Sequence, residues 1–315
     1  MKKMLFLGAK IIVSIALIWW LIRQVDWQGV SQQIYNISLP FLFAYVFLQL
    51  AGNVISARKW QIIASFKNLH FTVKEGFFAY LTGAFINNFL PSTIGGDAYR
   101  GLWLANRSGA KAAALSTVVF DRFIGLWTLA FFVFLLSPLL FPFIGTSLPL
   151  AVALSAVTAF LMLDVLIAYA YCRPWFHQFI ARIPFQKVRR LLEEVIFYTK
   201  KHIWWRTSLW SGLFIFVGIA FSNFMLFRAL GSDIQFLPFA SVIFLVTIIS
   251  AIPLSINNIG VKEWAYVTFF GLVGISVETA ITVALLSRFL QMLISFIALP
   301  QYLSTRAQEK AAAKI

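Results

Sequence analysis

Unbroken apolar segments of about twenty residues recur along the chain, and they constrain its fold more than any other feature. Twenty residues of α-helix cross the hydrocarbon core of a bilayer, whereas membrane β-strands alternate in polarity over about ten residues. Only 12% of the residues are charged and 61% are hydrophobic, whereas about a quarter of the residues in soluble domains are charged. The sequence therefore predicts an all-α integral membrane protein.

Six segments are long and apolar enough to be predicted as transmembrane helices. They are residues 4–22, 39–57, 113–136, 149–171, 207–227 and 277–299. The first segment follows Lys2 and Lys3, as the apolar region of a signal peptide does. It is span-length and no cleavage site of small residues follows it, so we expect it to remain as an anchor.

Two further apolar regions, residues 76–106 and 236–274, are interrupted by a motif that the chain contains twice. The motif reads FLPSTIGGDAYRG from Phe89 and IPLSINNIGVKEW from Ile252. A related element follows each copy, STVVFDRF from Ser116 and TVALLSRF from Thr282. Duplicated helix-breaking residues and charges inside apolar sequence indicate the binding site of a transporter.

The residue types in the two motifs explain why the chain is expected to bend there. Proline removes a helical hydrogen bond, glycine permits a sharp turn, and each half of an interrupted region is too short to cross a bilayer comfortably. We therefore expect two re-entrant helical hairpins, with asparagines that satisfy backbone groups freed at the breaks. The residues at these breaks are Asn87, Asn88, Pro91, Pro253, Asn257 and Asn258.

Basic residues in the loops predict the orientation of the segments, because cytoplasmic loops are enriched in Lys and Arg. They place both termini and the basic stretch 173–206 in the cytoplasm of a protein of the inner, cytoplasmic membrane. The first hairpin then enters from the cytoplasmic face and the second from the opposite face, as in an inverted-topology repeat. The net charge of +15 is interpreted as topology and contact with anionic lipid, not as binding of nucleic acid.

The whole chain is expected to form one membrane domain. Its parts are an anchor helix and external loop (1–38), a first repeat (39–140), a linking span with a basic amphipathic segment at the cytoplasmic surface (149–206), a second repeat (207–303) and a cytoplasmic tail (304–315). One cysteine cannot form an internal disulfide, and the three histidines show no ligand spacing. No metal or cofactor is expected, and no ATP hydrolysis, because a phosphate-binding loop is lacking.

Eight ionisable side chains are predicted to lie at membrane depth, four acidic and four basic. They are Asp97, Arg100, Asp121, Arg122, Asp164, Lys262, Glu263 and Arg288. An unpaired charge costs about 2.5–3.5 kcal/mol at the centre of a membrane helix, so these groups must pair or face water. One interpretation is an ionic network that only closes the hairpins against the bundle. The other is a binding site at the duplicated positions.

The second interpretation assigns a role to each group. A helix that begins after a break presents backbone N–H groups and a positive dipole end, which favours anions. The residues expected to bind a phosphate head group are Gly95, Gly96, Arg100, Arg122, Gly260, Lys262 and Arg288. The residues expected to act as charge partners or in proton coupling are Asp97, Asp121, Asp164 and Glu263.

The motifs also carry a resemblance to a known family. Residues Asn88–Arg100 (NFLPSTIGGDAYR), Val119–Gly125 (VFDRFIG) and Pro253–Glu263 (PLSINNIGVKE), with Arg288, resemble the lysylphosphatidylglycerol synthase transmembrane, or flippase-like, family. The resemblance covers residues 39–303 and implies a lipid translocase. Because about a dozen residues follow the last predicted span, we expect no soluble aminoacyltransferase domain, and the lipid is left open.

The predicted function is therefore a flippase or scramblase rather than an enzyme. Its expected substrate is a phosphate-bearing membrane lipid, either a phospholipid or a polyprenyl-phosphate glycolipid. One alternative is a membrane-embedded enzyme that uses Asp97, Asp121 or Glu263 as acid or base. Another is a scaffold whose partner is a separate lipid-synthesising transferase.

Overall fold

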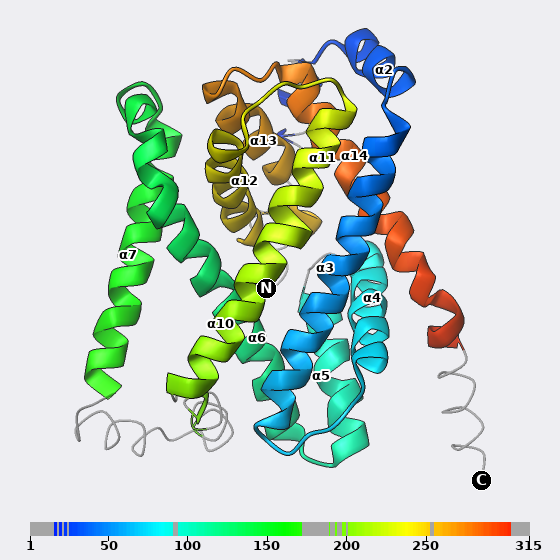
Figure 1. Cartoon of the computed structure of the whole chain (residues 1–315), viewed down its shortest axis with the longest axis vertical. Helices are drawn as coiled ribbons and strands as arrows, with labels where there is room; N and C mark the ends of the chain where they lie inside the picture. Colours follow the sequence, from blue (N-terminus) through cyan, green and yellow to red (C-terminus); the bar gives the residue numbers. More distant parts are fainter. Residues whose placement is uncertain are drawn as a thin grey trace.

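Every secondary-structure element in the described part of the chain is helical, as the sequence predicts. The computed structural model describes residues 25–90, 94–171, 201–252 and 255–303 continuously, and a few positions between 16 and 23 and between 189 and 199. Figure 1 shows the long helices running in roughly one direction, with the first described helix, α2 (Trp27–Tyr35), at one end of the bundle.

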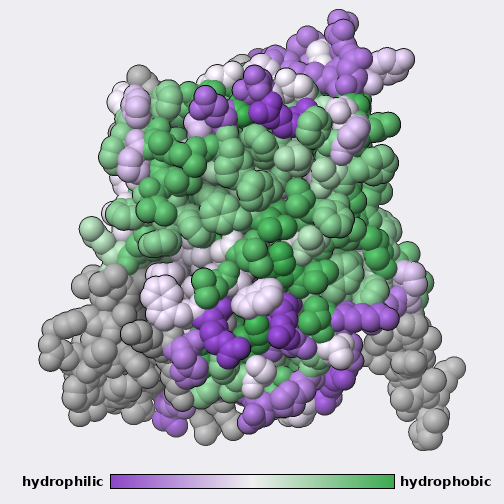
Figure 2. All heavy atoms as spheres, viewed as in Figure 1, coloured by the Kyte–Doolittle hydropathy of each residue, from purple (hydrophilic) through white to green (hydrophobic). Residues whose placement is uncertain are grey.

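Four helical segments are long and apolar enough to cross a membrane by their length and composition. They are Leu39–Ser65, Lys111–Phe143, His202–Ala229 and Val277–Leu303. On the face drawn in Figure 2, apolar side chains form a broad belt between two ends that carry more hydrophilic residues. The four segments overlap four of the six predicted spans, so the chain is a membrane protein with several apolar helices.

The two other predicted spans lie in less complete parts of the structure. Residues 149–171 fall in α7 (Leu148–Tyr171), an apolar helix that contacts α6 (Lys111–Leu136) and the following 3₁₀ turn η1 (Ser137–Thr146). Residues 4–22 lie almost wholly outside the described residues. The total of six spans therefore stays a prediction.

The two motif regions form two pairs of short helices. The first pair is α4 (Val73–Phe89) with α5 (Ile94–Ser108), and the second is α12 (Phe236–Ala251) with α13 (Val261–Leu272). Figure 1 shows α4 and α5 in the lower half of the bundle and α12 and α13 in the upper half. Each region is interrupted between its two helices, as the sequence predicts. The first and last residues of each helix pair lie within three residues of the predicted bounds, 76–106 and 236–274.

The helices of the first pair approach each other closely because both lack a side chain at the contact. A Cβ added to Gly96 of α5 would lie 2.3 Å from the backbone oxygen of Gly83 of α4, which is far inside van der Waals contact. The start of α4 is fixed by a capping box, in which Thr72 and Glu75 bond each other's backbone N–H groups. Glycine at position 96 is therefore required for the two helices to pack as they do.

A π-helical segment interrupts the long helix between α10 (Lys201–Phe214) and α11 (Ser222–Ala229). This segment, η3 (Ile215–Phe221), lies against α3 (Leu39–Ser65), where Gly218 meets Gly52. A Cβ on Gly52 would lie 2.7 Å from the Gly218 Cα, so the two backbones touch without intervening side chains. Such π-helical turns are rare and are frequent at functional sites.

The core consists largely of aromatic and aliphatic side chains from α11, α12, α13 and α14 (Val277–Ser295). Phe227 lies 4.5 Å from Phe270 and 5.3 Å from Phe239 between ring centroids, and all three are fully buried. Ring pairs at these separations are favourable beyond the area that they bury. The second helix pair is thus held rigidly against the bundle.

Two predicted surface segments need comment. Lys201 to Arg206 belong to α10, so the end of the predicted amphipathic segment is part of a long helix rather than a separate surface helix. Trp204, in that stretch, packs against the rings of Phe123 and Trp127. The rest of the basic segment is almost entirely outside the described residues, as is the tail 304–315.

Candidate functional site

The first ion cluster is centred on Asp121, which α6 places between α3 and α5. Lys59 Nζ lies 2.9 Å from Asp121 Oδ1, and Arg100 Nη1 lies 3.1 Å from Oδ2. Tyr80 of α4 also donates a hydrogen bond to the Asp121 carboxylate, and the guanidinium of Arg100 lies 3.9 Å from the centre of its ring. All three charged side chains are buried. Two cations and a phenol therefore fully engage this carboxylate.

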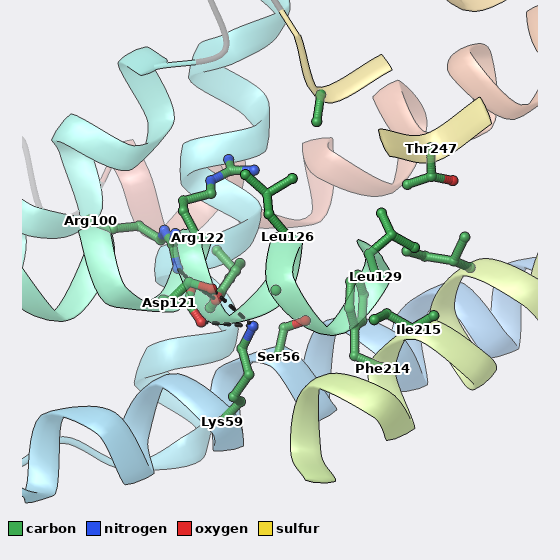
Figure 3. Close-up of a pocket in the computed structure, with 14 residues that line it drawn as sticks. Ser56, Lys59, Arg100, Asp121, Arg122, Leu126, Leu129, Phe214, Ile215 and Thr247 are labelled. Carbon is green, nitrogen blue, oxygen red and sulfur yellow. Dashed lines mark hydrogen bonds and ion pairs between the residues drawn. The ribbon is translucent and has the colours of Figure 1, made fainter. Parts of the chain in front are cut away.

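Asp97 connects this buried cluster to a more exposed cation. Its Oδ1 lies 2.8 Å from Arg100 Nη2, and its Oδ2 lies 2.6 Å from Arg122 Nε. The Arg122 side chain is 57% exposed, whereas Arg100 is 3% exposed. Figure 3 shows Lys59, Arg100 and Asp121 converging while Arg122 is turned away from them. Three basic and two acidic groups leave this cluster with one formal net positive charge, and Arg122 is its most exposed member.

The second ion cluster is built by the turn between α12 and α13. Arg288 of α14 donates from Nε and Nη2 to Glu263 Oε1, at 3.1 and 2.9 Å. Its other contacts go to the backbone oxygens of Asn257 and Asn258, at 3.0 and 3.1 Å. Both asparagines have positive φ angles, of 47° and 56°, a conformation that asparagine tolerates better than most residues. Arg288 thus holds the turn in place with four of its five N–H donors.

Lys262 is the second cation of this cluster. Its Nζ donates to the Ser287 hydroxyl at 2.8 Å. The described residues give it no carboxylate within ion-pair distance, since Glu263 is engaged by Arg288. The side chain is partly exposed to a cavity inside the bundle. The second cluster therefore also carries one net positive charge.

Two of the glycines at the helix starts have their backbone N–H groups bonded to side chains of the protein. The Gly96 N–H donates to Asn87 Oδ1 at 2.7 Å, and the Gly260 N–H donates to Glu263 Oε2 at 2.7 Å. Gly260 has a φ of 88°, which a residue with a side chain adopts only with strain. These N–H groups are therefore already bonded within the protein, and Gly96 and Gly260 shape the turns instead.

The remaining predicted positions are placed as follows. Asn88 donates to Ser295 Oγ at 2.9 Å, which links the end of α4 to α14. Gly95 lies at the start of α5 beside Leu90. Asp164 lies in α7, where the structure describes the backbone only. Pro91 and Pro253 lie outside the described residues.

Two adjoining cavities lie between the clusters. The smaller, about 200 Å³, includes Lys59, Tyr80, Arg100, Asp121 and Arg122 in its wall, and Figure 3 shows it in close-up. The larger, about 480 Å³, includes both Arg122 and Lys262 and has no acidic residue in its wall. The walls share Arg122, Phe214, Ile219, Thr247 and Ala251. Arg122, which is ion-paired with Asp97 but largely exposed, and Lys262, one from each half of the chain, therefore both lie in the wall of the larger cavity; the two adjoining cavities together are called the polar cavity.

An apolar groove of about 620 Å³ adjoins the polar cavity on the side of α7. Its wall is formed by α6, α7, α12 and α13, and every described side chain in it is apolar apart from the indole of Trp264. Ala251 belongs to the walls of the groove and of both cavities, and Leu126 to those of the groove and the smaller cavity. A charged region and a hydrocarbon-like region thus meet at the same residues.

Some residues of the site are absent from the predicted set. Lys59 lies just beyond the predicted span 39–57, but α3 continues to Ser65 and buries it against Asp121. The larger cavity also contains four carboxamide side chains, those of Gln49, Asn53, Asn223 and Gln291. Polar residues inside predicted spans were a usable signal for these four, because such residues are rare at membrane depth.

Comparison with known proteins gives a family. The sequence matches the family described as the lysylphosphatidylglycerol synthase TM region over residues 8–298. A UPF0104 membrane protein from Methanocaldococcus jannaschii is 28% identical over 114 residues, which are 36% of this chain and 34% of that relative. The matched stretch thus covers about a third of the relative's length. No solved structure matches the chain.

Proposed function

Because the chain belongs to the lysylphosphatidylglycerol synthase TM family, we propose that it is a lipid translocase, a flippase or scramblase of the cytoplasmic membrane. Its substrate is a phosphate-bearing lipid that it moves between leaflets. The observation that carries the proposal is the pair of cations, Arg122 and Lys262, in the wall of a cavity that has no acidic residue among its lining residues. The protein acts as a transporter, not as an enzyme.

The charge of the cavity favours an anionic ligand. Placing an unpaired cation at membrane depth costs about 2.5–3.5 kcal/mol on the insertion scale. Lys262 bears this cost with only a hydroxyl as its hydrogen-bond partner among the described residues. A bound phosphate offsets the cost through charge-assisted hydrogen bonds. The site is therefore most stable when an anion is bound, which is the property required of a head-group site.

The helix pairs support a route for the head group across the membrane. In the proposed topology, α4 with α5 and α12 with α13 are re-entrant hairpins that enter from opposite faces, and both termini are cytoplasmic. Irregular backbone at membrane depth is tolerated where it lines a cavity, and paired broken helices of opposite orientation are typical of transporters that work by alternating access. The helix after each turn contributes one charged residue. In the first pair it is Asp97 of α5, the ion-pair partner of Arg122, and in the second pair it is Lys262 of α13.

The apolar groove supplies a place for the lipid's hydrocarbon chains. Because the groove and the polar cavity share Ala251 in their walls, one amphipathic lipid can place its head group in the cavity and a hydrocarbon chain in the groove. Lipid tails are as apolar as the groove, so the groove contributes little affinity of its own. Its effect is to keep the chain beside the head group while the head group changes sides.

Reconstitution into liposomes tests the proposal. Lipids with a reporter on the head group are placed in one leaflet, and their movement is followed by quenching from outside. Arg122→Gln and Lys262→Gln are expected to slow movement, and Arg107→Gln serves as the control, because its ion pair with Glu75 is exposed and remote from the cavity. Equal movement in protein-free and protein-containing vesicles over a panel of anionic lipids would overturn the proposal.

A further inference from the structure

The larger cavity has a second chemical character besides its positive charge. Four carboxamides line it, contributed by three different helices, α3, α11 and α14. They are Gln49, Asn53, Asn223 and Gln291. Uncharged polar side chains inside a bundle of apolar helices are costly and mark functional positions. Four such side chains around one cavity indicate a ligand that carries further hydrogen-bonding groups besides a phosphate.

The protein orients these amides without exhausting them. Each amide nitrogen carries two hydrogens and donates to a described residue: Gln49 to Ser222, Asn53 to the Gln49 backbone oxygen, Asn223 to the Ile219 backbone oxygen, and Gln291 to Tyr45. Gln49 also contacts the Tyr45 hydroxyl, and the Asn223 amide oxygen accepts from Tyr266. The second hydrogens of Asn53, Asn223 and Gln291 and the amide oxygens of Gln49, Asn53 and Gln291 are left for a ligand. The Ser250 hydroxyl, in the same wall, is buried and has no hydrogen-bond partner among the described residues.

The chemistry of these groups identifies what they bind. A carboxamide both donates and accepts hydrogen bonds, as a hydroxyl group does. Phosphate oxygens only accept and an ammonium only donates, so neither uses a set of four amides fully. The two cations in the wall repel an ammonium, and no carboxylate is present there to pair with it. The wall therefore matches a head group with an anionic phosphate and several hydroxyls.

We propose that the larger cavity selects a lipid phosphodiester whose head group is a polyol or sugar, and that it rejects head groups bearing an ammonium. The inference rests on the proposed function, because it names the substrate class of the same site. A glycerophospholipid such as phosphatidylglycerol and a glycosyl phosphoprenol both have this chemistry. The aminoacylated lipid after which the family is described carries an ammonium, and this cavity discriminates against it.

A binding measurement tests the head group separately from transport. The full-length protein in detergent is titrated with short-chain phosphatidylglycerol, phosphatidylinositol, phosphatidylmethanol, phosphatidylethanolamine and lysylphosphatidylglycerol, and thermal stabilisation is recorded. The first two should bind about tenfold or more tightly than the other three. A separate titration with a short-chain glucosyl phosphoprenol shows whether the polyol phosphate that binds belongs to a glycerophospholipid or to a polyprenyl-phosphate glycolipid. Tighter binding of phosphatidylmethanol or of the lysylated lipid overturns the inference.

Substitutions locate the selectivity. Gln49→Leu and Gln291→Leu replace an amide by an apolar group of similar shape, and each should reduce the preference for phosphatidylinositol over phosphatidylmethanol. Gln32→Leu is the matched control, because Gln32 is exposed on α2 and lies away from the cavity. An unchanged preference in both cavity variants would assign the selectivity elsewhere and overturn the inference.

The same lipids in the liposome assay keep the two proposals apart. Movement of lipids without regard to hydroxyls or ammonium would leave the translocase intact and overturn the selectivity. Selective binding without movement of any lipid would overturn the translocase while supporting a polyol-phosphate site.

Discussion

Lys262 donates a hydrogen bond to Ser287, with 2.8 Å between Nζ and Oγ. In the duplicated elements STVVFDRF and TVALLSRF, this serine stands where the first half of the chain has Asp121. The corresponding place thus holds a carboxylate in one half and a neutral hydroxyl in the other. Asp121 pairs with the buried Lys59 in the first cluster, whereas Lys262 in the second has only the neutral Ser287 hydroxyl as its hydrogen-bond partner among the described residues.

Restoring the carboxylate should impair the site. Ser287→Asp gives Lys262 an ion-pair partner, which competes with an anionic head group and should lower its affinity by about tenfold, or ~1.4 kcal/mol. Ser287→Asn adds the same bulk without the charge and should lower affinity far less. Titration of both variants with short-chain phosphatidylglycerol measures the difference. Equal losses would show that bulk at this position, not charge on Lys262, matters.

Substitutions in the buried and in the exposed part of the first ion cluster should differ in their effect on the free energy of unfolding. Asp121→Asn leaves Lys59 and Arg100 buried without their shared carboxylate, and breaking such a buried pair costs about 3–5 kcal/mol. Arg122→Gln removes a largely exposed cation and should cost under about 1 kcal/mol. The free energy of unfolding in mixed micelles measures both. A small cost for Asp121→Asn would mean that water or another cation already compensates this carboxylate.

Alanine substitutions at two glycines should change the free energy of unfolding in opposite directions. One glycine, Gly96, lies at the close contact of α4 and α5, and the other, Gly271, lies in α13. Glycine to alanine within a helix normally stabilises by about 0.5–1 kcal/mol. Gly271→Ala should follow this rule, because a Cβ there meets nothing within 4 Å. Gly96→Ala should instead destabilise by about 1–3 kcal/mol, because its Cβ would overlap the Gly83 backbone. Thermal unfolding of the two variants measures the effect. Stabilisation by both substitutions would mean that α4 and α5 can move apart at Gly96 without a loss of stability.

Filling the apolar groove should block transport without affecting the polar cavity. Ala156 of α7 lines the groove, whereas Ala151 lies on another face of the same helix. Ala156→Trp is expected to slow lipid movement about tenfold, which corresponds to ~1.4 kcal/mol in the barrier. Ala151→Trp should leave the rate nearly unchanged, and binding of short-chain lipids should be unaffected in both. Equal rates in the two variants would remove the groove from the path.

Much of the fold follows from local sequence. Apolar segments of span length and two interruptions by helix breakers give the helices and the positions of both turns within a few residues, because helix formation and breaking in an apolar chain depend on nearby residues. Helix lengths depend on more distant contacts. The apolar pattern ended the second predicted span at residue 57, yet α3 extends to Ser65, and Asp121 compensates Lys59 inside the bundle.

The site could be predicted in part. The duplicated charges identified the ion clusters, and Arg122 and Arg288 do pair with acids of the adjacent turn helices. Which cation lacks an acidic partner depends on three-dimensional neighbours: Arg100 and Arg122 share Asp97 and Arg288 engages Glu263, while Lys262 has only the Ser287 hydroxyl among the described residues. The carboxamides were missed because they lie in three helices that meet only in the folded chain. The capping of Gly96 by Asn87, nine residues earlier, likewise requires the turn to exist first.

The bare contact between Gly52 and Gly218 has a mechanical consequence. Helices bend most readily where the regular bonding ladder is broken, and η3 is such a place on the wall of the larger cavity. The Phe214 ring and the hydrogen bond from Gln49 to Ser222 flank the contact and keep α3 joined to the helix that contains η3. A bend at η3 would change the separation of Asn53 and Asn223, so the width of the larger cavity depends on the angle at this π-helical segment.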